Sequence, residues 1–156
     1  LKRGYEPLFL PPNLWILIMV GSTRTYNIVI TKESKEIKMS NTLYKKTDDE
    51  LLSIFEPLME NLLQGSTERD HQKHTKDFTQ RIRNLVSKEK LERMCSEYQK
   101  KLGYFTKREF LYLFRRKDSV AVIWRLFFTK SDDEFVLEAV FIENNGRIMI
   151  DHCMIF

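Results

Sequence analysis

The chain has 156 residues and is 42% hydrophobic, with eleven phenylalanines, six tyrosines and two tryptophans. A chain of this length can bury one hydrophobic core but hardly two, so we expect a single domain. The formal net charge is +4, yet residues 40–156 carry 20 basic and 19 acidic side chains, interleaved along the chain. Because a nucleic-acid-binding domain normally shows a local basic excess, we expect no nucleic-acid partner.

The first 38 residues differ in composition from the rest, and three of the four prolines of the chain lie within the first twelve positions. Since Met39 stands just ahead of the first capped helix, we interpret residues 1–38 as a leader that precedes the native start, or as a loosely attached segment. Residues 39–156 then form the domain, and a start at Met39 predicts a cytoplasmic protein.

Two alternatives for the same segment stay open. Residues 1–22 resemble a signal peptide, which would make the protein secreted, although Pro11 and Pro12 interrupt the apolar run. Alternatively, Tyr26–Thr31 forms a strand that adds to the edge of the sheet. The apolar run Leu14–Val20 predicts no membrane span, because a bilayer requires about 20 apolar residues.

Helical patterns fill the next part of the chain. Thr47 and Glu50 form a capping box, and apolar residues at helical spacing follow as far as Gly65, which predicts a left-handed cap. Pro57 predicts a kink near Glu56. The chain then indicates a second helix with the apolar face His74, Phe78, Ile82 and Leu85, and a third helix between a Ser87 cap and Gly103.

The histidines and cysteines do not indicate a metal site. His71 and His74 are three residues apart and could share a helix face, but zinc needs at least three protein ligands and no further His or Cys is placed to join them. Cys95 and Cys153 stand alone in apolar surroundings, which is typical of buried free thiols. We therefore expect neither a metal nor a cofactor.

Four β-rich segments complete the chain, and polar turns separate them. Their ranges are Arg108–Arg116, Val120–Thr129, Phe135–Glu143 and Arg147–Phe156. The pair Asn145-Gly146 favours a type I′ hairpin turn. We therefore predict an α+β fold in which the helices pack on a curved four-stranded antiparallel meander.

The turns give a register in which Ala139 faces both His152 and Trp124, and Leu111 faces Trp124. Because side chains alternate along a strand, one face of the sheet is then almost wholly apolar, and the helices are expected to cover it. The same face holds Glu109 at the end of the first strand. We expect a ligand pocket there, lined by Trp124, His152, Leu111, Leu126, Leu137 and Phe78.

The other face mixes apolar side chains with charges, and Arg125 is predicted to form a cross-strand ion pair with Glu138. Such a face is too apolar for water alone and is typical of a homodimer interface. The residues expected in that interface are Ile123, Arg125, Phe127, Val136, Glu138 and Val140.

The order of elements resembles the NTF2-like, or cystatin-like, superfamily of α+β cone domains. The likeness lies in Lys76–Thr79, Leu85–Leu91, Leu102-Gly103 and Val122–Trp124, and it covers about residues 48–156. These segments look like small bacterial proteins of unknown function within that superfamily. Members of the superfamily include isomerases, cyclases, dehydratases and binding or assembly modules, so the resemblance implies a fold and leaves the function open.

The sequence therefore predicts a homodimer that binds a small apolar ligand or acts as an accessory protein. Two alternatives stay open. The first is an isomerase, dehydratase or cyclase that uses His152 or Glu109 as an acid or base, and the second is an interaction module that acts through the outer sheet face. No Ser-His-Asp or Cys-His arrangement and no phosphate-binding glycine loop is present.

Overall fold

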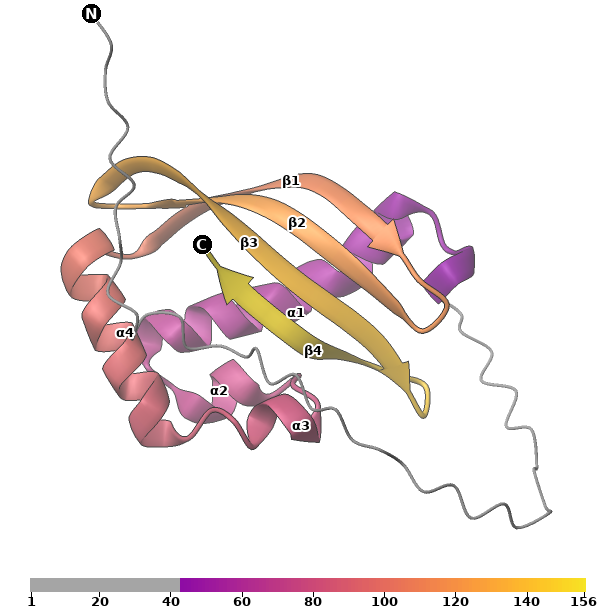
Figure 1. Cartoon of the computed structure of the whole chain (residues 1–156), viewed down its shortest axis with the longest axis horizontal. Coiled ribbons are helices and arrows are strands. Elements are labelled where there is room, and N and C mark those ends of the chain that lie inside the picture. The colour runs from indigo at the N-terminus through magenta and orange to yellow at the C-terminus, as the bar shows by residue number, and fades with distance from the viewer. Residues whose placement is uncertain (1–42) are drawn as a thin grey trace, which may run out of the picture. The chain divides into compact units, whose positions relative to one another are not determined.

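The computed structural model describes residues 43–156. The leader 1–38, the start at Met39, the signal peptide 1–22 and the strand Tyr26–Thr31 all lie outside the described residues. Figure 1 shows the described part, with helices preceding a four-stranded sheet. Within it, no helix is long and apolar enough to cross a membrane.

A short 3-10 helix, η2 (Leu43–Lys45), leads into the long helix α1 (Asp48–Glu68). The predicted capping box is confirmed, because Thr47 accepts from the backbone of Glu50 and the Glu50 carboxylate accepts from the backbone of Thr47. The predicted end at Gly65 is wrong. The helix continues through Pro57 and Gly65 and ends at Arg69, which adopts the left-handed conformation with φ 58°.

Gly65 instead allows a close approach of the next helix. A Cβ atom at this position would lie 2.4 Å from the backbone nitrogen and 2.6 Å from the Cα atom of His74. The residue is a glycine because the α2 backbone packs directly on α1, which leaves no room for a side chain.

The single second helix predicted from the sequence is two short helices, α2 (His71–Thr75) and α3 (Gln80–Arg83). The break occurs because the segment between them pairs with the last strand. Phe78 forms a parallel bridge with Ile150, and backbone hydrogen bonds join Thr79 N to Ile150 O and Ile150 N to Asp77 O. Helix α4 (Lys88–Leu102) then begins at the predicted Ser87 cap and ends at Gly103, which has φ 83°.

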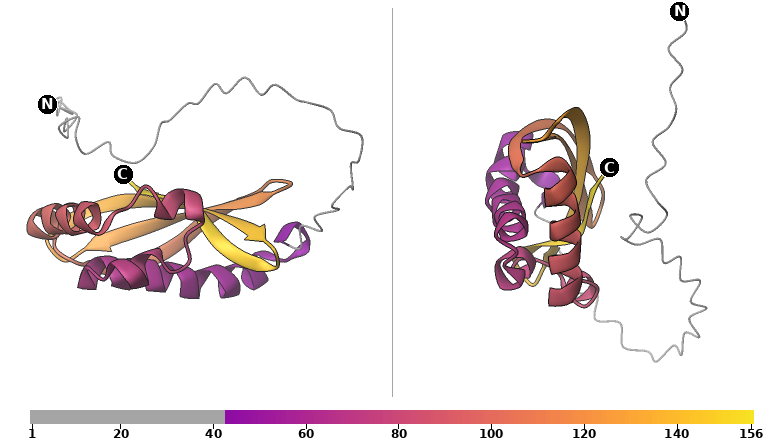
Figure 2. Two further views of the ribbon diagram at one scale, coloured as in Figure 1. Left: turned by 90° about the horizontal axis from the view of Figure 1, so that it is seen from below. Right: turned by 90° about the vertical axis from the view of Figure 1, so that its left-hand side faces the viewer.

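The sheet contains β1 (Phe105–Arg115), β2 (Ser119–Phe128), β3 (Ser131–Asn144) and β4 (Arg147–Ile155). Its strands are antiparallel in the order β1-β2-β3-β4, which confirms the predicted meander. Asn145 and Gly146 both have positive φ, at 51° and 77°, as a type I′ turn requires. Helix α1 lies across one face of the curved sheet, here called the inner face (Figures 1 and 2).

Two bulges make the predicted register wrong along parts of the edge strands. In β1 the pairs are Phe110 with Trp124 and Tyr112 with Ile123, so Leu111 is an extra residue. In β4 the extra residue is Asp151, because Ile150 of β4 pairs with Phe141 of β3 and His152 of β4 pairs with Val140 of β3. Each bulge reverses which face the following side chains occupy.

The pairing of β2 with β3 is shifted by two residues from the prediction, so that Trp124 faces Leu137 instead of Ala139. A shift of two leaves every side chain on its predicted face. Trp124, Leu137 and Phe141 accordingly lie fully buried beneath α1. There Phe55 of α1 stacks on Phe141, with ring centroids 3.9 Å apart.

Candidate functional site

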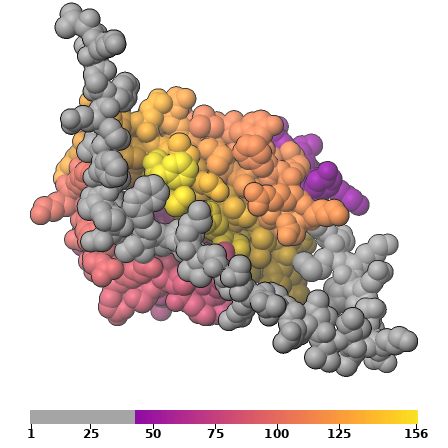
Figure 3. Space-filling model, in the orientation of Figure 1, coloured from indigo at the N-terminus to yellow at the C-terminus, as the bar shows by residue number. Residues whose placement is uncertain are grey.

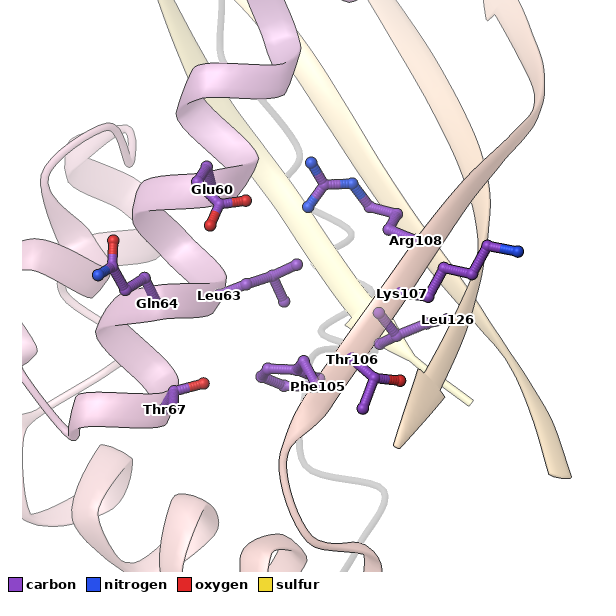
Figure 4. Close-up of a pocket in the computed structure, with 9 residues that line it drawn as sticks. All are labelled: Glu60, Leu63, Gln64, Thr67, Phe105, Thr106, Lys107, Arg108 and Leu126. Atoms are coloured by element: carbon purple, nitrogen blue, oxygen red, sulfur yellow. The ribbon is translucent and has the colours of Figure 1, made fainter. Parts of the chain in front are cut away.

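A cavity of about 380 Å³ lies between α1 and the first half of β1 (Figure 4). It is here called the α1–β1 cavity. Its walls come from three elements: four residues of α1, four of β1 and one of β2. The lining residues are Glu60, Leu63, Gln64, Thr67, Phe105, Thr106, Lys107, Arg108 and Leu126.

The helical wall follows from the sequence of α1. Glu60, Leu63, Gln64 and Thr67 are spaced three, four and seven positions apart, so they lie on one stripe of the helix. Glu56, one turn earlier, continues this stripe toward the core. The stripe combines one buried apolar side chain, Leu63, with polar groups, so this side of α1 does not seal against the sheet.

Arg108 is the most buried of the charged side chains that line the cavity. The bulge at Leu111 places it opposite Leu126, on the inner face, and its side chain is only 10% exposed. Its Nη2 donates to the Glu56 carboxylate, which also accepts from Trp124 Nε1 at 3.0 Å. The guanidinium lies 5.7 Å from the centre of the Trp124 ring. A half-buried carboxylate therefore holds a buried arginine and a buried indole together.

Sequence reasoning missed this group. The predicted register has no bulge in β1, and it therefore assigns the inner face to Glu109 instead of Arg108. In the structure Glu109 pairs with Arg125 across the strands, so it lies on the opposite, outer face. Lys107 forms an ion pair with Glu109, and the hydrogen bond from Lys107 and its charge lower the Glu109 pKa.

The outer face of the sheet is mostly apolar. One row across the strands is Tyr112, Ile123, Glu138 and Met154, and the next is Phe114, Ala121, Val140 and His152. These strands, orange to yellow, face the viewer in Figure 3. Tyr112 and Phe114 are 60% and 52% exposed, and their rings contact edge to face at 4.9 Å.

Charged residues lie at one end of the outer face. The predicted ion pair between Arg125 and Glu138 is wrong, because the two-residue shift sets Arg125 opposite Val136. Arg125 instead contacts Glu134 at 3.1 Å and Glu109 at 3.6 Å. Glu138 lies between Ile123 and Met154, and within residues 43–156 it has neither a hydrogen bond nor an ion pair.

The side chains of His71 and His74 form hydrogen bonds with backbone carbonyl groups. His71 Nε2 lies 2.6 Å from Val86 O, and His74 Nδ1 lies 3.0 Å from Leu62 O and 2.8 Å from Ser66 Oγ. Burial lowers the His74 pKa to about 4, so this imidazole is neutral at pH 7. No group of three or more candidate metal ligands occurs in the described part of the chain.

Comparison with known proteins gives structural likeness only. No protein-family model and no curated protein matches the chain. A SEC-C motif containing protein from Rhodopseudomonas palustris is 13% identical with a TM-score of 0.47, over 62% of this chain and 74% of that one. A DUF4783 family protein from Bacteroides ovatus is 16% identical with a TM-score of 0.39, over 61% and 90%. A variant of the design Rd1NTF2_05 is 15% identical with a TM-score of 0.47, over 69% and 100%.

Likenesses this distant say nothing about function. The layout is itself informative, because helices are followed by a curved four-stranded antiparallel meander whose inner face they cover. This layout agrees with the NTF2-like resemblance drawn from the sequence.

The residues predicted to line an apolar pocket lie apart in the structure. Leu126 lines the α1–β1 cavity, while Trp124, Leu137 and Phe78 are buried in the core with at most 2% exposure. Leu111 is 44% exposed at its bulge.

His152 faces outward, because the Asp151 bulge turns Cys153 to the inner face in its place. The bulge has a visible cause, since Asp151 accepts from Thr79 Oγ1 at 2.7 Å and from Arg81 Nη2 at 2.8 Å. His152 and Glu109, the two predicted acid–base candidates, are thus both on the outer face and outside the cavity. Their catalytic role stays a prediction.

Proposed function

We propose that this chain is a homodimeric NTF2-like binding domain, an accessory protein that pairs through its outer sheet face. The observation that carries this proposal is the pair of apolar rows across the outer face. Ile123, Val140 and Met154 are half-buried within one copy, and Tyr112 and Phe114 stand beside them more than half exposed. Contiguous apolar surface of this kind in one chain is typical of a protein interface.

The charges of the outer face favour a second copy as the partner. Glu138 lies in the middle of the apolar rows, and within the described residues no side chain neutralises it. His152 is its diagonal neighbour on β4, since His152 pairs with Val140 and Met154 pairs with Glu138. A two-fold axis through this region brings each Glu138 toward the His152 of the other copy, so one surface supplies both members of two identical contacts.

The charged end of the face also fits a two-fold pair. Arg125 lies between Glu109 and Glu134, so these three side chains already neutralise one another in large part and form a polar rim. An apolar centre within a polar rim is the usual anatomy of an interface between stable partners. The interface expected from the sequence is therefore retained, with Tyr112, Phe114, His152 and Met154 added to it.

Sedimentation equilibrium of the full chain and of Ile123→Glu tests the pairing. Ile123 sits beside Glu138, so the substitution sets four carboxylates near the two-fold axis, and we expect a monomer. Leu85→Glu is the matched control, because Leu85 is an apolar residue outside the strands with 37% exposure, and it should remain a dimer. A monomeric wild-type chain, or an Ile123→Glu chain that remains dimeric, would overturn the proposal.

The binding role of the domain is the second part of the proposal. The inner face beneath α1 is closed by Trp124, Leu137 and Phe141, all fully buried, whereas the α1–β1 cavity is open and lined by polar and apolar groups. Its volume of about 380 Å³ lies within the range of small-molecule sites, and its polar groups come from both walls. We therefore assign binding to the α1–β1 cavity.

A further inference from the structure

The charges that line the α1–β1 cavity specify a class of ligand. We propose that the cavity binds a small zwitterion with an apolar side chain, such as an aromatic amino acid, whose carboxylate contacts Arg108 and whose ammonium contacts Glu60. The inference deepens the proposed function and rests on it for the role of a binding domain.

Arg108 supplies the carboxylate-binding group. Its side chain is nine-tenths buried, and only Nη2 bonds to Glu56. Within residues 43–156 no acceptor binds Nε or Nη1 of Arg108. Both nitrogens are accessible to solvent, and Arg108 is one of the residues that line the cavity. A guanidinium edge with free N–H donors matches a carboxylate in both shape and charge.

Glu60 supplies the opposite charge. In Figure 4 its carboxylate and the Arg108 guanidinium point toward one another from opposite walls of the cavity. The two groups nevertheless form no ion pair, which would require a separation of 4.0 Å or less, and Glu60 has no hydrogen bond to any described residue. The two groups are therefore more than 4.0 Å apart, and each is left to bind a ligand charge of its own.

The balance of charge excludes a simple anion or a simple cation. Arg108 and Glu56 neutralise one another, and Lys107 points out of the cavity toward Phe127 on the outer face, 5.8 Å from that ring (Figure 4). A simple anion at Arg108 would therefore meet the negative charge of Glu60. A simple cation at Glu60 would leave the free donors of Arg108 to water and would meet the positive charge of the guanidinium. A ligand that carries both charges and has no net charge satisfies both walls.

Apolar side chains surround the remaining space. Leu63 of α1, Phe105 of β1 and Leu126 of β2 line the cavity. The Phe105 ring is held in place by Tyr98 and Phe128, with centroids 5.1 Å and 5.0 Å away. A fixed and partly exposed ring beside two leucines suits a flat or branched apolar side chain on the ligand.

Calorimetric titration of the full chain with L-phenylalanine tests the ligand class. Two analogues act as matched probes: L-phenylalaninamide lacks the carboxylate, and 3-phenylpropionate lacks the ammonium. We expect L-phenylalanine to bind, and each analogue to bind roughly 10- to 100-fold more weakly because a charged hydrogen-bond partner is lost. Absence of binding at about 1 mM, or equal binding of either analogue, would overturn the proposal.

Substitutions locate the site. Glu60→Gln should weaken the binding of L-phenylalanine and strengthen that of 3-phenylpropionate, because it removes the carboxylate that attracts the ammonium and repels a simple anion. Arg108→Lys should weaken the binding of both because lysine has no planar fork. Glu97→Gln, an exposed carboxylate on α4, is the matched control and should bind normally. If Arg108→Lys unfolds, Glu60→Gln and the two analogues still show whether the cavity binds a zwitterion. Sedimentation of the same samples reports the dimer separately, so failure of this ligand class and failure of the pairing are distinguishable.

Discussion

Gly65→Ala is predicted to destabilise the protein, although alanine is the better helix former. In an exposed helix interior this change gains about 1 kcal/mol. Here the new Cβ would lie 2.4 Å from His74 N and 2.6 Å from His74 Cα. Both are backbone atoms, so no rotation of a side chain relieves the overlap, and α2 must move away from α1.

The loss of stability can be estimated from the packing and the hydrogen bonds that this movement of α2 disturbs. Overpacking of this kind costs about 1–3 kcal/mol. The shift also weakens the contacts of His74 Nδ1 with Leu62 O and Ser66 Oγ, each worth about 1 kcal/mol. After the gain in helix propensity is subtracted, we expect a net loss of about 2 kcal/mol in the free energy of unfolding.

Urea unfolding followed by far-ultraviolet circular dichroism measures this loss. A loss of about 2 kcal/mol corresponds to a midpoint lower by about 1 M, for a urea dependence near 2 kcal/mol/M. Ser96→Ala, at an exposed position within α4, is the matched control and should be neutral or slightly stabilising. A midpoint that rises in Gly65→Ala would refute the close packing of α2 on α1.

Two further predictions concern pH and the β4 bulge. Because burial lowers the His74 pKa to about 4, the unfolded chain binds more protons than the folded chain between pH 6.5 and 4, and the unfolding free energy should fall by roughly 2–3 kcal/mol as pH drops through that range. His74→Gln should flatten this pH dependence, which urea titrations at several pH values measure. An unchanged pH dependence would contradict a buried neutral imidazole. Asp151→Ala removes the hydrogen bonds from Thr79 and Arg81 and should lower the free energy of unfolding by about 1–3 kcal/mol, as measured by thermal unfolding. Asp132 is an exposed residue early in β3, so the control Asp132→Ala should leave this free energy almost unchanged.

The order of the elements could be predicted from the sequence because its signals are local. The Thr47 box, the Ser87 cap and the Asn145-Gly146 turn each depend on a few neighbouring residues. Gly65 was misassigned because its cause is a contact with His74, nine residues later. The same holds for the division of the second helix, which depends on pairing between Phe78 and Ile150.

The faces on which the candidate residues lie were harder to predict because they depend on bulges in β1 and β4. The runs Phe110–Phe114 and Ile148–Ile150 are apolar at every position, so alternation of side chains gives no phase that would show an extra residue. A register without bulges therefore assigns the inner face to Glu109 and His152. With bulges at Leu111 and Asp151, those two face outward and Arg108 faces inward. In the central strands β2 and β3 each side chain lies on its predicted face, because a register shift of two residues does not change the face.

Pairing through the outer sheet face fixes the distance between two copies, and this distance can be measured. A spin label at Ile142→Cys, on that face, can be introduced alone, because burial raises the pKa of Cys95 and raises that of Cys153 to about 12, so both thiols react slowly. Double electron–electron resonance should then give one defined intermolecular distance, shorter than that of a label at Ser53→Cys on α1. No intermolecular coupling, or a shorter distance for the α1 label, would contradict pairing through the sheet.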